Sequence, residues 1–294
     1  MKIKFSVLTL LIISANCLFA QNNNLKLWYT ASANYWEEAL PLGNAKTGAM
    51  VFGRVNKERI QINNNTLWSG YPYPGNNPKG AAALPLVRKA ITNGEYGKAA
   101  EIWKKNLQGP YSARYLTMAD LFLDFNLKDS TAKNYHRELD LTNAVNTLTY
   151  QIGNTNFKRE TLVSHPDQVM VIRLTADRPN ALNFITSINS KLKYTVTAKD
   201  FNYLILRGKA PKHVAHRNTE PEQLVYDDKE GMTFEVHVKL KLEGGAIKTI
   251  GDRLQVINAN AVTIYLADGT SFNGFDKSPG LEGINPALEP ISDL

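Results

Sequence analysis

The chain has 294 residues, of which 43% are hydrophobic and 21% are charged. This composition excludes a disordered or collagen-like chain, and the length suffices for one large β-domain or two ordinary domains. The formal net charge is +7, but no basic run is longer than Lys104 and Lys105, so we predict no nucleic-acid partner.

The N-terminus has the pattern of an export signal. "MKIK" supplies positive charge, "FSVLTLLII" is a short apolar segment, and "SANCLFA" ends in a small residue before Gln21. We predict cleavage after Ala20 and a periplasmic or extracellular location. A lipid anchor on Cys17 is disfavoured because Asn16 is bulky and polar where a small residue is expected. The apolar segment is shorter than the ~20 residues of a spanning helix, and no later stretch approaches that length, so no membrane span is expected.

A glycine-containing stretch follows at residues 39–55. Gly43 and Gly48 are five apart, with a lysine and a threonine between them, as in an incomplete phosphate-binding loop. Such a loop requires lysine and then serine or threonine directly after the second glycine, where this chain has Ala49 and Met50. We therefore predict turns between short strands rather than a nucleotide site.

Helical periodicity is confined to residues 84–107, which we interpret as two short helices broken at "NGEYG". From about residue 119 onward the sequence alternates with period two or forms β-rich runs, joined by turn sequences such as "IGNTN", "ADRPN" and "EGG". This pattern predicts a mainly β fold, a large antiparallel β-sandwich. Residues 272–294 are rich in glycine and proline and have little periodicity, as in a linker that is disordered in isolation.

Two histidines are the strongest candidates for a binding surface. His213 and His216 lie between Pro211 and Pro221, so an irregular loop is expected there rather than a helix. Together with Glu220 they could hold a metal, but we favour no metal and no cofactor. Long polar loops between strands often carry binding residues, so His213 and His216 are predicted to contact a substrate or another domain.

Neighbouring acids suggest the two carboxylates of glycoside hydrolysis. Glu37 and Glu38 would point to opposite faces of a strand, and Asp120 and Asp124 flank an apolar run as strand-edge charges do. Solvated or turn-capping roles are therefore expected for these acids. His165 is interpreted as a strand-entry residue, because no serine or cysteine nucleophile motif accompanies it. We expect no catalytic residue in this chain.

Four tryptophans have two possible roles. Trp28, Trp36, Trp68 and Trp103 could stack on sugar rings, because pyranose faces present C–H groups to aromatic rings. Packing in the core explains them as well, and we favour the core.

Four separated blocks carry a resemblance to a known family. In chain order they are "LWYTASANYWEEALPLGNAKTGAMVFGRVNKERIQINNNTLWSG", "YHRELDL", "FKRETLVSHPDQVMVIRLTA" and "DGTSFNGFDKSP". From about Leu27 to its end the chain resembles the N-terminal region of glycoside hydrolase family 95, which comprises inverting α-L-fucosidases and some α-L-galactosidases. The chain departs from the family at residues 45–48, where relatives have Gly-Arg-Leu-Gly, and at residues 119–120, where they have Gly-Asp.

The resemblance implies a domain organisation. Residues 1–20 would be the signal peptide, residues 21–271 the N-terminal β-sandwich, and residues 272–294 a truncated linker toward an absent (α/α)6 barrel. In the family the catalytic glutamate and the water-activating asparagine lie in that barrel, and no residue here matches them. The chain is thus expected to be an exported fragment, inactive alone, that meets a fucosylated glycan through the full-length enzyme. The alternative is a free-standing, non-catalytic carbohydrate-binding β-sandwich.

Overall fold

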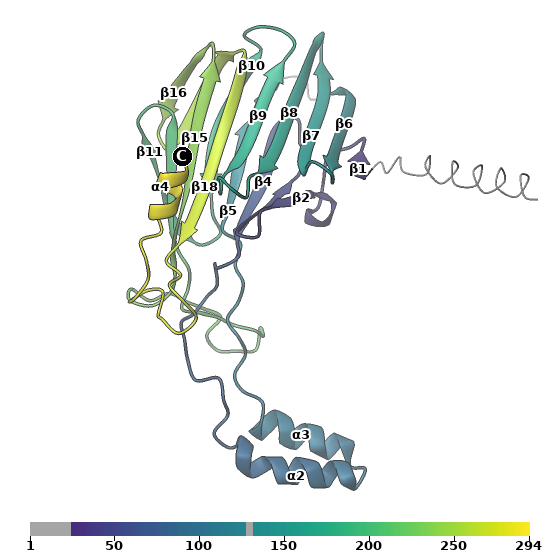
Figure 1. Cartoon of the computed structure of the whole chain (residues 1–294), viewed down its shortest axis with the longest axis vertical. Coiled ribbons are helices and arrows are strands. Elements are labelled where there is room, and N and C mark those ends of the chain that lie inside the picture. The colour runs from purple at the N-terminus through teal and green to yellow at the C-terminus, as the bar shows by residue number, and fades with distance from the viewer. Residues whose placement is uncertain (1–24, 128–131) are drawn as a thin grey trace, which may run out of the picture.

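Two stacked antiparallel sheets form most of the molecule (Figure 1). The computed structural model describes residues 25–127 and 132–294, so the predicted signal peptide lies outside the described residues. The larger sheet has nine strands over that part of the chain, in the order β1 (Lys26–Tyr29), β6 (Lys133–Asp140), β7 (Val145–Ile152), β8 (Thr155–Val163), β9 (Met170–Ala176), β18 (Ala261–Thr270), β15 (Thr233–Glu243), β12 (Tyr203–Lys209) and β11 (Lys193–Lys199).

The second sheet covers the inner face of the first. Over the described residues it has seven strands, in the order β16 (Ala246–Ile250), β17 (Arg253–Ala259), β10 (Leu182–Asn189), β5 (Ala119–Asp124), β4 (Lys57–Asn64), β3 (Thr47–Val51) and β2 (Leu40–Gly43). Within the described residues every strand pair is antiparallel, including pairs that join strands distant in sequence, such as β9 with β18. The predicted large antiparallel β-sandwich is confirmed.

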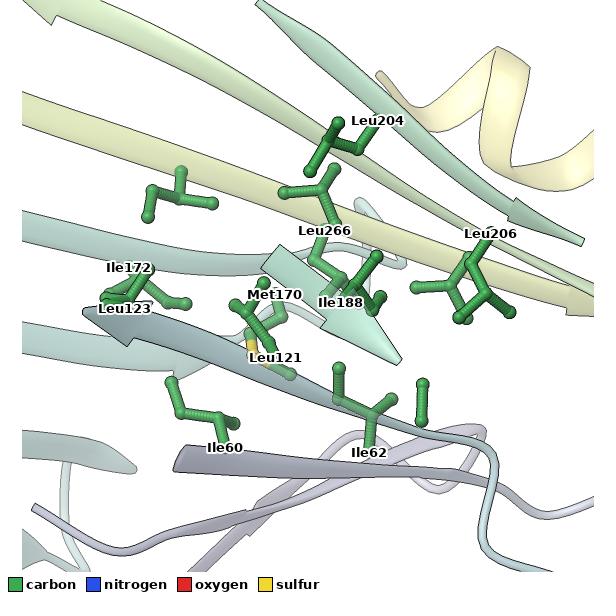
Figure 2. Packing of buried hydrophobic residues seen from close by; sticks show 14 of the residues in the cluster. Ile60, Ile62, Leu121, Leu123, Met170, Ile172, Ile188, Leu204, Leu206 and Leu266 are labelled. Atoms are coloured by element: carbon green, nitrogen blue, oxygen red, sulfur yellow. The ribbon is translucent and has the colours of Figure 1, made fainter. Parts of the chain in front are cut away.

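The core lies between the two sheets (Figure 2). Ile60 of β4 and Leu121 of β5 are fully buried from one side, and Ile172 of β9 and Leu266 of β18 from the other. Because successive strand residues point to opposite faces, each strand contributes every second side chain to this layer. The period-two alternation in the sequence is the direct cause of the two-sheet packing.

The hairpin connections have the turn chemistry that the sequence indicates. Gly153 in "IGNTN" has φ 57°, and Asn180 in "ADRPN" has φ 59°. Both lie in the left-handed region, which glycine and asparagine adopt at least cost. These residues therefore fix where β7 gives way to β8 and where β9 gives way to β10.

A helical hairpin stands away from the sandwich (Figure 1). It consists of α2 (Gly80–Thr92) and α3 (Tyr96–Asn106), reached through extended segments on both sides. The two predicted helices and the break between them are confirmed, although the first begins four residues before the predicted residue 84. A short 3-10 helix, η1 (Trp36–Glu38), follows β1. Within the described part of the chain, no helix has both the length and the apolar character needed to cross a membrane.

The C-terminal segment returns to the outer face of the larger sheet. Its helix α4 (Leu288–Asp293) packs on β15 and β18, as Figure 1 shows. Ser271 Oγ donates to the carbonyl oxygen of Pro279 at 2.7 Å, and Lys239 Nζ donates to the carbonyl oxygen of Leu294 at 2.8 Å. The segment is thus tied to the sandwich and lacks the disorder that its composition suggested.

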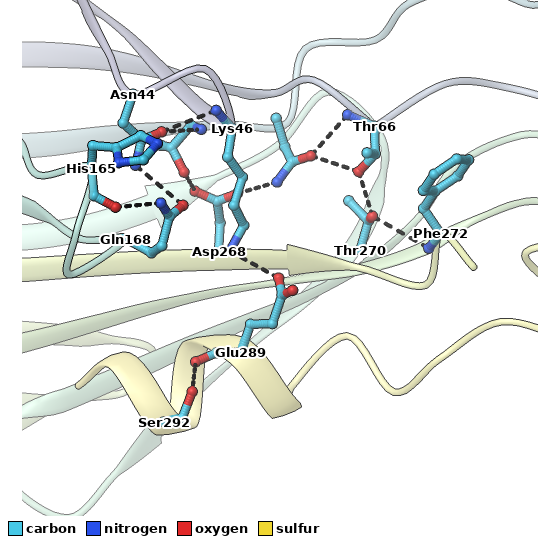
Figure 3. Close-up of polar contacts among 12 residues, drawn as sticks. Asn44, Lys46, Thr66, His165, Gln168, Asp268, Thr270, Phe272, Glu289 and Ser292 are labelled. Carbon is cyan, nitrogen blue, oxygen red and sulfur yellow. Dashed lines mark hydrogen bonds and ion pairs between the residues drawn. The ribbon is translucent and has the colours of Figure 1, made fainter. Parts of the chain in front are cut away.

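The stretch at residues 39–55 forms the β2–β3 hairpin, as predicted, and also joins the two sheets (Figure 3). Thr47 Oγ1 and Asn64 Nδ2 each donate a 2.6 Å hydrogen bond to the buried carboxylate of Asp268 on β18. The neighbouring Lys46 forms a 2.8 Å ion pair with Glu289 of α4. The lysine and threonine that suggested a phosphate loop therefore have partners within the fold.

Asp268 makes the stability of the fold depend on pH. Burial raises the pKa of its carboxyl group, and the hydrogen bonds from Asn64 and Thr47 oppose that rise only in part. Because the pKa of Asp268 is higher in the folded than in the unfolded protein, its contribution to the free energy of unfolding is fully present below the unfolded pKa. That contribution is lost as the pH rises through the folded pKa. Asparagine does not titrate, so the stability of an Asp268→Asn variant relative to the natural protein should increase as the pH is raised from about 4 to about 7. Urea unfolding at both pH values measures this difference, and Asp252→Asn at an exposed turn is the matched control. A difference that stays constant with pH would contradict the expectation.

Candidate functional site

A groove of about 640 Å3 lies at the end of the sandwich from which the helical hairpin extends. Residues 69–73, 110–113 and 212–222 supply its walls. The backbone N–H of Ser69 donates to the carbonyl of Arg114 at 2.8 Å, and that of Gly70 donates to the carbonyl of Pro211 at 3.0 Å. These bonds bring three segments, far apart in sequence, to one place.

One wall of the groove is aromatic and cationic. The Tyr111 and His216 rings stack with their centroids 4.6 Å apart, and the guanidinium carbon of Arg217 lies 5.4 Å from the Tyr111 centroid. Arg217 also donates to the Tyr111 hydroxyl, and the Tyr73 hydroxyl donates to the Tyr111 backbone carbonyl. Tyr111 is therefore held in place from both of its ends.

Glu220 organises the loop that carries the two predicted histidines. Its Oε1 accepts the backbone N–H groups of His216 at 3.0 Å and Arg217 at 2.9 Å, while its Oε2 lies 3.8 Å from His213 Nε2. The loop is irregular, as the flanking prolines indicate, apart from a two-residue pairing of β13 (His213–Val214) with β14 (Leu224–Val225). His213 and His216 thus both line the groove.

His216 also links this loop to the segment at residues 110–113. Its Nε2 lies 2.7 Å from the carbonyl oxygen of Ser112. A carbonyl can only accept, so Nε2 carries the hydrogen, and Nδ1 is the acceptor in the neutral ring. Next to it, Lys212 Nζ lies 2.9 Å from Asp227 Oδ2, and this bond and two backbone N–H groups hold the pKa of Asp227 well below its usual range.

The groove has the chemistry to bind a polar ring such as a sugar. An aromatic ring offers a stacking surface, and cationic, imidazole and carboxylate groups beside it can bond hydroxyl groups. Within residues 25–127 and 132–294, no group of three or more histidine, cysteine, aspartate and glutamate side chains is arranged to hold a metal ion. The arrangement is suited to contact with a ligand or with another domain.

Sequence reasoning did not single out Tyr73, Tyr111 and Arg217 as groove residues. The signal available was the tyrosine and proline clusters "YPYPG" and "GPYSARY", which lie just before and just after the two helices. Nothing in one sequence says that these clusters meet the loop at 212–222, since that contact is long-range.

The acids considered for catalysis have structural roles. Asp120 is buried, contrary to the predicted solvated or capping role, and it receives two hydrogen bonds from Arg59 at 2.8 and 3.2 Å. Asp124 and Glu38 accept backbone N–H groups in adjacent turns, and Glu37 is exposed, as expected of capping and solvated acids. His165 lies exposed in the turn that leads into β9.

The prediction that the tryptophans pack in the core is wrong. Trp28, Trp36, Trp68 and Trp103 are 61%, 48%, 42% and 45% exposed. Trp28 lies on the edge strand β1, Trp36 on η1 and Trp103 on α3, and Trp68 directly precedes the groove residue Ser69. The Trp36 indole N–H donates to Gln61 Oε1 at 2.6 Å, so its polar end is partnered while one side of the ring faces solvent.

Comparison with known proteins gives a consistent result. Residues 27–274 match the family model described as the N-terminal domain of glycosyl hydrolase family 65. The resemblance found in the sequence is thus supported at the level of an N-terminal glycoside hydrolase domain, although the matching model bears the number 65 and the resemblance pointed to 95.

Three curated relatives are fucosidases by name. Alpha-L-fucosidase 2 of Arabidopsis thaliana is 32% identical over 279 residues, which cover 92% of this chain and 33% of the relative. Two proteins named probable alpha-fucosidase A are 35% identical over 51% of this chain in Aspergillus niger and 24% identical over 90% of it in Aspergillus oryzae. The chain spans 20–36% of the length of these relatives.

Proposed function

Because the chain belongs to the family of N-terminal domains of glycosyl hydrolase family 65, we propose that it is the N-terminal β-sandwich of an exported α-L-fucosidase-like glycoside hydrolase. The observation that carries the proposal is the match of nearly the whole sandwich to the fucosidase of Arabidopsis thaliana. The pattern of residues 1–20 supports export. In this proposal the catalytic groups belong to another module of the enzyme, and the sandwich alone is inactive.

The groove supports the proposal by its position and chemistry. It joins His213, His216 and Tyr111 at one end of the sandwich, beside the segments that carry the helical hairpin. Inverting glycoside hydrolysis requires an acid and a water-activating base on opposite sides of the bond, about 6.5–9.5 Å apart. Of the two acids that line the groove, Glu220 accepts two backbone N–H groups and Glu222 is exposed to solvent. We therefore assign the groove to contact with the glycan or with the catalytic module.

The test compares this chain with the longer polypeptide that the gene would encode. Release of L-fucose from 2′-fucosyllactose should be absent with residues 21–294 and present with the longer polypeptide. In the latter, Tyr111→Ala should raise KM about tenfold or more with kcat changed less, because it removes binding rather than a reacting group. Leu86→Ser, far from the groove, is the control. Turnover by residues 21–294 above a boiled sample would overturn the proposal.

The exposure of all four tryptophans favours a second candidate, a carbohydrate-binding sandwich that acts without a catalytic module. Trp28 has the strongest claim, since it is 61% exposed and stacks on His136, with Lys26 and Glu138 beside it on the same face. A calorimetric arm of the same experiment separates the two candidates. Saturable binding of the glycan by residues 21–294, lost in Trp28→Ala, would favour the second.

A further inference from the structure

The helical hairpin has a very small core of its own. Among its residues only Ala83, Val87, Ala90 and Ala99 are buried, with Ile102 and Leu107 packed partly against them. Isolated helices of 13 and 11 residues are marginal in water, because most helical stability in proteins comes from tertiary packing. A hairpin of this size, held away from the sandwich, would be stabilised by a further surface.

Four large side chains gather on one side of the hairpin. Successive residues of an α-helix are rotated by about 100° around its axis, so a residue that follows a buried one lies to one side of the helix–helix contact. Because α2 and α3 are antiparallel, the residues that follow buried ones lie on the same side of the hairpin in both helices. Leu84 and Ile91 follow buried residues of α2, Trp103 follows Ile102 of α3, and Tyr96 lies two turns before Trp103. These four residues, the hairpin face, are 36–71% exposed. Leu86, 56% exposed, points to the other side.

The hairpin also holds a large share of the net positive charge of the chain. Residues 79–107 contain six lysines and arginines against two glutamates, a net charge of +4. The whole chain carries +7, of which Lys2 and Lys4 in the predicted signal supply two. Two of these cations border the hairpin face. Arg88 lies one turn after Leu84, and Lys104 directly follows Trp103. Two copies meeting by this face would bring like charges together, so charge complementarity favours an acidic partner.

We propose that the hairpin face docks on the catalytic module of the same polypeptide, in an apolar groove with an acidic rim. This inference rests on the proposed function. The matching family is one of N-terminal domains, and this chain spans about a third of the Arabidopsis relative. Both segments that carry the hairpin, residues 69–73 and 110–113, also line the groove with His213 and His216. A module held by the hairpin face therefore lies beside that groove.

Hydrogen–deuterium exchange tests the contact in the longer polypeptide and in this chain. Amides of α2 and α3 should exchange about tenfold or more slowly in the longer polypeptide. The double variant Ile91→Ser with Trp103→Ser should abolish that protection. It should leave the unfolding of this chain alone unchanged, because the hairpin face has no partner there. Leu86→Ser, which changes an exposed leucine on the other side, should alter neither.

Several results would overturn the inference. Equal exchange in the two forms would do so, as would an equal effect of Leu86→Ser. Dimerisation of this chain that Ile91→Ser abolishes would place a second copy on the hairpin face. Binding to phosphatidylglycerol vesicles that the double variant abolishes would place a lipid surface there.

Fucoside hydrolysis measured on the same samples separates this inference from the proposed function. A longer polypeptide that hydrolyses the substrate with an unprotected hairpin refutes the docking alone, whereas a protected hairpin without hydrolysis refutes the fucosidase proposal alone. A gene that encodes no further module would refute both.

Discussion

Replacing Arg159 by methionine should lower the free energy of unfolding by about 3–5 kcal/mol. Arg159 of β8 and Glu58 of β4 form an ion pair across the two sheets, with side chains 3% and 0% exposed. Glu58 Oε1 also accepts the backbone N–H of Gly53 at 2.9 Å, and the Phe125 ring lies 5.2 Å from the guanidinium carbon of Arg159. Methionine fills much of the same space but leaves the Glu58 carboxylate buried without a cation.

Urea unfolding near neutral pH measures the loss, and the pH dependence identifies its cause. Burial raises the pKa of Glu58 even beside Arg159, and removal of Arg159 should raise it further. A raised folded pKa gives stability that is present below the unfolded pKa and lost as the pH rises through the folded pKa. The penalty of Arg159→Met should therefore shrink as the pH is lowered toward about pH 4, because a protonated Glu58 leaves no buried charge without a partner.

A double variant is the control for this pair. Glu58→Leu with Arg159→Met removes both charges, so it should recover most of the stability that Arg159→Met alone loses. A single variant that loses less than about 1 kcal/mol, or a double variant as unstable as the single one, would show that the buried charge is not the cause.

The predictable part of this fold is local. Alternation of apolar residues indicated the strands, and turn residues such as Gly153 and Asn180 indicated where they end. The pairing of β9 with β18 was beyond that reasoning, because it joins residues some ninety positions apart. The same limit applies to Arg159 and Glu58, since each looks like an ordinary surface charge until the two sheets are stacked.

The candidate site was predictable only in part for the same reason. The prolines around residues 211–221 indicated an irregular polar loop, and His213 and His216 do line the groove. Tyr111 comes after the helical hairpin in sequence and yet lines the same groove. Hydrophobic periodicity reports only local structure, so it could not predict this long-range contact. Trp103 was predicted to be buried and is exposed. An apolar stripe on a helix indicates that this face is covered in the complete protein, but it does not identify the surface that covers it.

Removal of the Phe234 ring should have an effect as large as the loss of Arg159. Phe234 of β15 is fully buried and pairs directly with Gly208 of β12. A side-chain carbon built on Gly208 would overlap the Phe234 ring, so the ring occupies the space that the missing side chain leaves. In Phe234→Ala both positions lack a large side chain. We expect unfolding free energy to fall by about 3–5 kcal/mol, in the upper part of that range, because little can move into the cavity.

The coupling between the two positions provides the decisive measurement. Gly208→Ala alone should cost about 1–3 kcal/mol, because the new methyl group forces the Phe234 ring to move. In the Phe234→Ala background the same methyl group enters the cavity, so the double variant should be more stable than Phe234→Ala alone. Urea unfolding of the four proteins gives the interaction energy directly. Simple additivity of the two losses would mean that the ring of Phe234 does not lie on Gly208 in solution.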